Sequence, residues 1–160
     1  MNEKRTILFL CTGNCCRSQM GEAILRYLDP VHFRALSAGS QPAGFVHPLV
    51  FETMEAMHIP VIDQHSKSWE KYFDQPIDLL ITLCNEAANE VCPIWPNRPP
   101  TAHWPLPDPS FMLGPDRDQL TAALRVAERL RLKIQRLIAL DWKRYTANEL
   151  AGELEKIAEL

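Results

Sequence analysis

The sequence predicts an α/β domain built on a mostly parallel β-sheet, and three observations support this fold class. Short apolar runs alternate along the chain with longer segments whose apolar residues recur at helical spacing. The run within Asp78 to Leu83 reads Leu-Leu-Ile-Thr-Leu, which is typical of a strand buried on both faces of a parallel sheet. The length of 160 residues suits one domain that buries its own core. We therefore expect right-handed crossovers, with helices on both faces of the sheet.

The N-terminal half contains the pattern of a strand followed by a helix twice. Thr6 to Leu10 is an apolar run that predicts the first strand. Thr12-Gly13-Asn14 breaks this pattern, and Gln19 to Leu28 then resumes at helical spacing. Phe33 to Ser37 predicts a second strand, and Pro48 to Met57 predicts a second helix with one apolar face.

The C-terminal half adds the Leu-rich strand, a fourth strand and two helices. Thr101 to Trp104 predicts the fourth strand, and the prolines of Pro105 to Pro109 exclude a helix and stiffen the loop that follows. Asp116 to Leu140 carries a long apolar stripe, which predicts a helix that covers the sheet. Thr146 and Glu149 have the spacing of a capping box for a short final helix.

Charge and composition exclude several classes of function. The net charge is -3 and no apolar run approaches a membrane span, so we expect neither nucleic acid nor a membrane as a partner. The first apolar stretch is too short for a secretion signal, so we expect a cytoplasmic protein whose five cysteines do not form permanent disulfides. Four basic residues of the long helix are expected to form a solvated face: Arg125, Arg129, Lys133 and Arg136. Any bound anion must therefore be held by a local group of residues, because the overall charge does not attract it.

The segment between the first strand and the first helix provides such a local anion-binding group. It reads Cys11-Thr12-Gly13-Asn14-Cys15-Cys16-Arg17-Ser18. A loop this short curls its backbone N–H groups around one point, and the helix N-terminus adds partial positive charge there. A Cys11 thiolate at that point is stabilised by these N–H groups and by the Ser18 hydroxyl, which leaves it reactive at neutral pH. Arg17 can clamp two oxygens of a tetrahedral oxyanion.

Residues 12–18 are here called the oxyanion loop, and both the roles of their side chains and alternative interpretations of the loop can be considered. Gly13 is expected to adopt a backbone conformation that other residues resist, and Asn14 to brace the loop through its amide. One alternative is that Cys11 is only a buried cysteine at a strand end and Arg17 only a surface residue. This alternative would not explain why the loop that joins them lies between a strand and a helix. An ATP-binding loop is disfavoured because no Gly-Lys-Ser/Thr follows Gly13. No metal is predicted, because neither Cys-x2-Cys nor His-x3-His occurs.

The run Cys11 to Met20 resembles the signature loop of low-molecular-weight protein tyrosine phosphatases and of the arsenate reductases that share their fold. Ser37-Ala38-Gly39 and Asp108-Pro109 extend the resemblance. We expect a phosphatase-like arsenate reductase domain over residues 1–140, with residues 141–160 as a C-terminal helical extension of it. Gln19-Met20 follows the serine where the phosphatases usually carry proline, and so resembles the reductase branch.

This resemblance implies a fold and a set of site residues. The fold is a four-stranded parallel sheet flanked by helices, as in low-molecular-weight tyrosine phosphatases. Cys11 is implied as the nucleophile, Arg17 as the oxyanion clamp and Asp108 as the general acid. The residues that it implies for oxyanion binding are Thr12, Gly13, Asn14, Cys15, Cys16, Arg17 and Ser18.

Two further cysteines distinguish a reductase from a phosphatase. A thiol-dependent reductase supplies electrons by forming a disulfide, whereas a phosphatase needs one thiolate and an acid. Cys84 ends the strand expected beside the Cys11 strand, so we expect its sulfur to reach Cys11. Cys92 follows Asn85 to Val91, which reads as one or two helical turns. Cys84 and Cys92 can join only if that segment unwinds, since in a helix they would lie about 12 Å apart, beyond the limit of about 7 Å.

The segments around Cys84 and Cys92 resemble the redox segment of thioredoxin-coupled arsenate reductases. This resemblance implies that Cys11 attacks arsenate, that Cys84 attacks Cys11 and releases arsenite, and that Cys92 passes the disulfide to thioredoxin. No cofactor is implied. A related branch uses glutathione or mycothiol instead. Two other functions stay open: a low-molecular-weight protein tyrosine phosphatase with a Cys-phosphate intermediate, and a thiol redox or arsenic sensor without turnover.

Other residues of the loop region have less defined roles. Cys16 matches the second loop cysteine of the family, either as a protective disulfide partner of Cys11 or as a small residue packed under the loop. Cys15 has no assigned role. Three residues resemble a cation-binding group of the reductases: Asn14, Glu22 and Ser37. Ser68 stands where an aspartate is expected in that group, and no ion is predicted.

Overall fold

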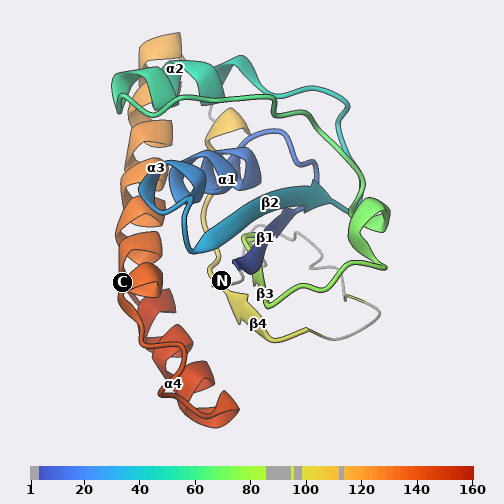
Figure 1. Cartoon of the computed structure of the whole chain (residues 1–160). Coiled ribbons are helices and arrows are strands. Elements are labelled where there is room, and N and C mark those ends of the chain that lie inside the picture. The colour runs from blue at the N-terminus through green and yellow to red at the C-terminus, as the bar shows by residue number, and fades with distance from the viewer. Residues whose placement is uncertain (1–3, 86–94, 96–98, 112–113) are drawn as a thin grey trace.

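The computed structural model describes residues 4–85, 95, 99–111 and 114–160 of the chain. Its strands form one parallel sheet in the order β2-β1-β3-β4 (Figure 1). The strands are β1 Arg5–Cys11, β2 Phe33–Gly39, β3 Leu79–Thr82 and β4 Thr101–His103. The predicted four-stranded parallel sheet is confirmed, and each strand ends within two residues of its predicted bounds.

The helices also begin and end near their predicted positions. Their bounds are α1 Arg17–Leu28, α2 Pro48–Ala56, α3 Asp116–Ala139 and α4 Ala147–Ala158, with short 3-10 helices η1 Trp69–Tyr72 and η3 Pro109–Phe111. Thr146 caps α4 by accepting a hydrogen bond from the Glu149 backbone N–H at 3.2 Å, as one half of the predicted capping box requires. None of the helices in the described ranges is both long enough and apolar enough to cross a membrane.

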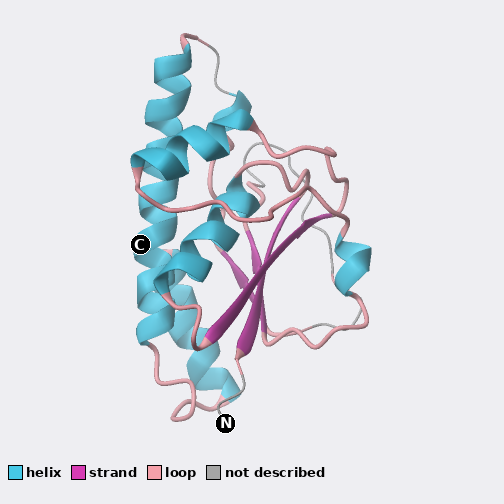
Figure 2. Ribbon diagram, turned by 45° about the horizontal axis from the view of Figure 1, so that its top comes forward, coloured by secondary structure: helices cyan, strands magenta, loops and turns pink. Residues whose placement is uncertain are grey.

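The two faces of the sheet are covered differently (Figure 2). Alternate residues of β1 point to opposite faces, so Ile7 and Phe9 join the core beneath α1, α2 and α3, whereas Leu8 and Leu10 join a smaller core. The predicted helices flank both faces in the described part of the chain, but the helix over the smaller core is only the short 3-10 helix η1. Three aromatic rings pack edge to face there and supply the missing apolar cover: Trp69, Phe73 and Trp95.

Lys133 is the exception to the predicted solvated face of α3. Its side chain is buried, and its ammonium donates hydrogen bonds of 2.8–3.2 Å to the carbonyls of Ile157, Ala158 and Leu160. These are carbonyls at the C-terminal end of α4, where a cation interacts favourably with the helix dipole. Burial, with the nearby Arg129 charge as a second cause, lowers the pKa of Lys133. The lysine thus fastens α4 to α3, which supports the proposal that residues 141–160 extend the same domain.

Replacing Lys133 with methionine is expected to lower the free energy of unfolding by about 1–3 kcal/mol, because three carbonyls lose a charged donor while the apolar stem is kept. Urea unfolding followed by circular dichroism measures this. Lys156→Met is the matched control, since Lys156 is exposed and pairs only at the surface with Glu153. Equal stabilities for the two variants would contradict a fastening role for Lys133.

Candidate active site

The oxyanion loop connects β1 to α1 at the carboxyl end of the sheet, where open parallel sheets bind their ligands. The carbonyls of Thr12, Gly13 and Cys15 accept hydrogen bonds of 2.8–2.9 Å from the backbone of residues 41–47. In a trans peptide the N–H points opposite to the carbonyl, so the N–H groups of the following residues turn away from residues 41–47. An anion-binding loop requires this orientation, and the N-terminus of α1 adds its partial positive charge.

Asn14, and not Gly13, adopts the unusual backbone conformation in the loop. Its φ is 46°, in the left-handed region, whereas Gly13 has no positive φ. Asn14 tolerates this conformation because its side chain is held at both ends: Nδ2 donates to Ser18 Oγ at 2.8 Å, and Oδ1 accepts from the Lys67 backbone N–H at 3.0 Å. The predicted bracing by the Asn14 amide is confirmed, and the prediction that Gly13 adopts a backbone conformation other residues resist is wrong.

Cys11 is the last residue of β1, and its side chain is buried. Its Sγ lies 2.9 Å from Ser18 Oγ. Ser18 Oγ already accepts a hydrogen bond from the Asn14 amide, so its own proton is available for the sulfur. The three residues form a hydrogen-bonded chain that can stabilise a thiolate at Cys11.

Arg17 begins α1 and joins the oxyanion loop to two other segments. One terminal nitrogen donates to the carbonyls of Leu83 and Leu106 at 3.2 and 2.9 Å. The other terminal nitrogen lies 3.5 Å from Asp108 Oδ2. The Arg17 side chain is only 4% exposed, so its guanidinium is fixed before any ligand arrives. Arg17 therefore holds Asp108 at the same sheet edge as the oxyanion loop.

Asp108 lies in the proline-rich loop directly before η3. Its Oδ1 accepts hydrogen bonds from the backbone N–H and the hydroxyl of Ser110, at 3.0 and 2.6 Å. Its Oδ2 faces Arg17. The carboxyl group is thus held on one side and directed toward the site on the other, which suits the transfer of a proton to a leaving oxygen.

The other two loop cysteines are poor nucleophiles in this environment. Burial, with the nearby Cys11 sulfur as the next cause, raises the pKa of Cys15 to about 11. Burial also raises the pKa of Cys16, with the negative charge of Asp108 as the next cause. Cys16 belongs to the core under α1, which favours its role as a packed residue. Cys11, Cys15 and Cys16 are all free thiols.

Cys84 follows β3, which pairs directly with β1, as the sequence predicts. It is completely buried and disulfide-bonded, in contrast to the free thiol of Cys11. Cys92 lies outside the described residues. So does most of the segment 85–91, which must unwind if Cys84 and Cys92 are to join. The relay through Cys92 therefore remains a prediction.

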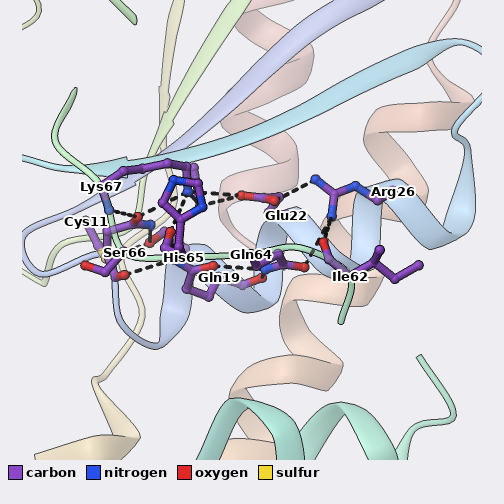
Figure 3. A network of polar contacts seen from close by, with 12 residues as sticks. Cys11, Gln19, Glu22, Arg26, Ile62, Gln64, His65, Ser66 and Lys67 are labelled. Carbon is purple, nitrogen blue, oxygen red and sulfur yellow. Dashed lines mark hydrogen bonds and ion pairs between the residues drawn. The ribbon is translucent and has the colours of Figure 1, made fainter. Parts of the chain in front are cut away.

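Lys67 occupies the group of oxygens that resembles a cation site. Its ammonium lies within 3.5 Å of Asn14 Oδ1, Ser37 Oγ and Glu22 Oε1 (Figure 3). Sequence patterns give no sign of this, because Lys67 stands in a polar stretch that reads as exposed. Its neighbour Ser68, at the position expected for aspartate, instead caps η1.

A pair of glutamines, Gln19 and Gln64, anchors the start of α1, and the sequence pattern does not indicate it. Gln19 Nε2 donates to the carbonyls of Asn14 and His65, at 3.0 and 2.9 Å. Gln64 Nε2 donates in turn to Gln19 Oε1 at 2.9 Å. Residues 64–67 therefore line the underside of the oxyanion loop, and only the folded chain reveals this.

A family model matches residues 6–143, and the family is that of low molecular weight phosphotyrosine protein phosphatases. The chain belongs to this family. A low molecular weight protein tyrosine phosphatase from T. tengcongensis shares the fold, with a TM-score of 0.67 at 22% identity over 84% of this chain and 98% of that one. Fold and family therefore agree.

Within this family the chain is similar to arsenate reductases. It is 40% identical over 110 residues to arsenate reductase 1 of Bacillus cereus, covering 69% of this chain and 81% of the relative. It is 34% identical to the arsenate reductase of Halalkalibacterium halodurans, covering 82% of this chain and 94% of that one. A thioredoxin-dependent arsenate reductase of Corynebacterium glutamicum has a TM-score of 0.62 at 27% identity, over 84% of this chain and 60% of that longer one.

Proposed function

We propose that this protein reduces arsenate to arsenite through Cys11, followed by a disulfide relay through Cys84 and Cys92 that thioredoxin regenerates. Relatives named as arsenate reductases support the reaction, and the thioredoxin-dependent relative supports the reductant. Cys84 is the observation that favours a reductase over a phosphatase. It is a buried, disulfide-bonded cysteine beside the Cys11 strand, and ester hydrolysis has no use for it.

The first step forms a bond between the Cys11 sulfur and arsenic. The Arg17 guanidinium and the loop N–H groups neutralise the charge of arsenate, and the Cys11 thiolate attacks. Asp108 donates a proton to the departing oxygen, which leaves as water. The distance of 2.9 Å between Cys11 Sγ and Ser18 Oγ supports this role for the thiolate, and the contact of Arg17 with Asp108 supports a shared site.

The next steps supply two electrons. Once thioredoxin has reduced the disulfide that holds Cys84 in this structure, the Cys84 thiolate attacks the Cys11 sulfur. A disulfide forms between them, and the electron pair of the sulfur–arsenic bond stays with arsenic, which leaves as arsenite. Cys92 then attacks Cys84 and releases the Cys11 thiolate. The dithiol of thioredoxin reduces the resulting disulfide and is itself oxidised. This cycle requires a compartment that keeps thioredoxin reduced, such as the cytoplasm.

Steady-state turnover with arsenate, thioredoxin, thioredoxin reductase and NADPH tests the relay. The intact chain is expected to turn over, Cys84→Ser to release no arsenite, and Cys92→Ser to release about one arsenite per chain, because each variant stops at a different disulfide step. Arsenite and NADPH are measured together. Glutathione or mycothiol in place of thioredoxin identifies the reductant. Undiminished turnover by Cys84→Ser would exclude the relay.

Phosphotyrosine hydrolysis is the second candidate, favoured by the family membership and by the intact loop. Hydrolysis of p-nitrophenyl phosphate also serves as the control for folding, since it needs Cys11 but neither Cys84 nor Cys92. We expect both serine variants to keep this activity. Efficient hydrolysis without arsenate turnover would favour the phosphatase, and binding of arsenite without either activity would favour the sensor.

A further inference from the structure

Lys67 carries a charge in the protein interior beneath the oxyanion loop. Its side chain is only 8% exposed, and its ammonium donates to the His65 carbonyl at 2.8 Å and to Ser37 Oγ at 3.1 Å. Burial lowers the pKa of Lys67, and the Glu22 carboxylate acts in the opposite direction. A lysine is rarely buried without a specific partner. The partner here is Glu22.

Glu22 lies in α1 and is equally buried, at 5% exposure. Its Oε1 accepts a hydrogen bond of 2.6 Å from Ser37 and lies 3.5 Å from the Lys67 ammonium. Its Oε2 pairs with Arg26 at 2.6 Å, and Arg26 also donates to the Ile62 carbonyl (Figure 3). The pair of charges therefore fixes the segment 62–67 against α1.

The same lysine contacts the oxyanion loop through Asn14. Both its backbone N–H and its ammonium point to Asn14 Oδ1, at 3.0 and 3.4 Å. Asn14 Nδ2 donates to Ser18 Oγ, which lies 2.9 Å from Cys11 Sγ. A continuous series of contacts thus runs from the buried ammonium to the sulfur. A positive charge at the oxygen end of an amide polarises it and strengthens the hydrogen bonds that its N–H groups donate.

We propose that Lys67 is a positioning residue for the Cys11 thiolate: its ammonium, paired with Glu22, orients the Asn14 amide so that the Ser18 hydroxyl donates to the sulfur. Lys67 acts through Asn14 and Ser18 and does not touch the substrate. The inference rests on the proposed role of Cys11 as the nucleophile, whichever oxyanion it attacks. It assigns to a built-in ammonium the place between Asn14, Glu22 and Ser37 that resembles a cation site.

Other charges also face the two ends of this series. Glu22 and Arg26 of α1 and Lys71 of η1 act on the ammonium. Arg17 and Asp108 lie beside the loop thiols. Arg17 and Asp108 are unchanged in the variants below, so they affect all of these variants equally.

The test follows alkylation of Cys11 by iodoacetamide across pH, with the site read by mass spectrometry of fully reduced protein. Lys67→Met keeps the stem and removes the charge. We expect the midpoint of the pH profile of alkylation to rise by about one unit, and alkylation at pH values below the midpoint to slow about tenfold. Lys71→Met is the matched control, because Lys71 is an exposed lysine of the same region. Its midpoint should not move.

Lys67→Met leaves Glu22 without its ammonium and so lowers stability. The double variant Lys67→Met/Glu22→Gln removes both charges, which restores stability and keeps the midpoint high if the ammonium itself acts on the loop. A midpoint equal to that of the unchanged chain in the folded double variant overturns the proposal, as does an equal rise in Lys71→Met. The assay contains no arsenate, so absence of arsenate turnover by the unchanged chain would refute the proposed function and leave this result intact.

Discussion

Replacing Arg17 with lysine is expected to lower kcat/KM for the oxyanion substrate by about two to three orders of magnitude. The guanidinium reaches the Leu83 and Leu106 carbonyls and Asp108 at the same time, so its plane is fixed relative to the loop. A lysine ammonium keeps the charge but cannot hold two oxygens of the substrate in this orientation. Initial rates of arsenate reduction and of p-nitrophenyl phosphate hydrolysis measure the effect.

Arg136→Lys provides the control for this prediction. Arg136 is exposed in the last turn of α3, and the same exchange there should leave both rates unchanged. A loss in Arg17→Lys that is confined to KM would mean that the guanidinium binds substrate without stabilising the transition state. Rates equal to those of the unchanged chain would contradict the role of Arg17 as the clamp.

Replacing Gly39 with alanine is expected to lower kcat/KM about a hundredfold and stability by about 1–3 kcal/mol. Gly39 ends β2 and pairs with Cys11 in the sheet. A Cβ at this position would lie 2.6 Å from the Thr12 carbonyl oxygen and 2.9 Å from the Asn14 nitrogen. Both are backbone atoms of the oxyanion loop, so the loop itself must move. Enzyme assays and urea unfolding measure the two effects.

Gly152→Ala is the matched control for this substitution. Gly152 lies inside α4, and a Cβ there meets no atom within 4 Å. Alanine should therefore stabilise the helix by about 0.5–1 kcal/mol and leave the rates unchanged. If Gly39→Ala retained full activity, the loop could not depend on close contact with the end of β2.

The features that the sequence predicts best are local ones. The apolar run from Thr6 to Leu10 predicts β1, and the short loop after it places Cys11 and Arg17 at one point. Both features depend only on neighbours in the chain. The Leu-rich run predicts β3 and its place beside β1. The approach of Asp108 to Arg17 follows from the rule that parallel strands end at one edge.

The features that the sequence does not predict depend on partners distant in the chain. Lys67 and Lys133 read as surface lysines, and each is buried because a distant segment supplies oxygens for its ammonium. The positive φ of Asn14 also depends on such a partner, since Lys67 holds its side chain. A pattern of residue types along the chain contains no information about these pairs.

Three cysteines lie within six residues of the loop region: Cys11, Cys15 and Cys16. A competing reaction is therefore conceivable, in which a loop cysteine forms a disulfide with Cys11 before the reductant is reached. Only deprotonated thiols exchange rapidly, and burial keeps the pKa of Cys15 near 11, so this thiol is protonated at neutral pH. Packing beneath the loop thereby keeps the neighbouring loop thiols from competing with the proposed disulfide relay, although both cysteines are present in the sequence.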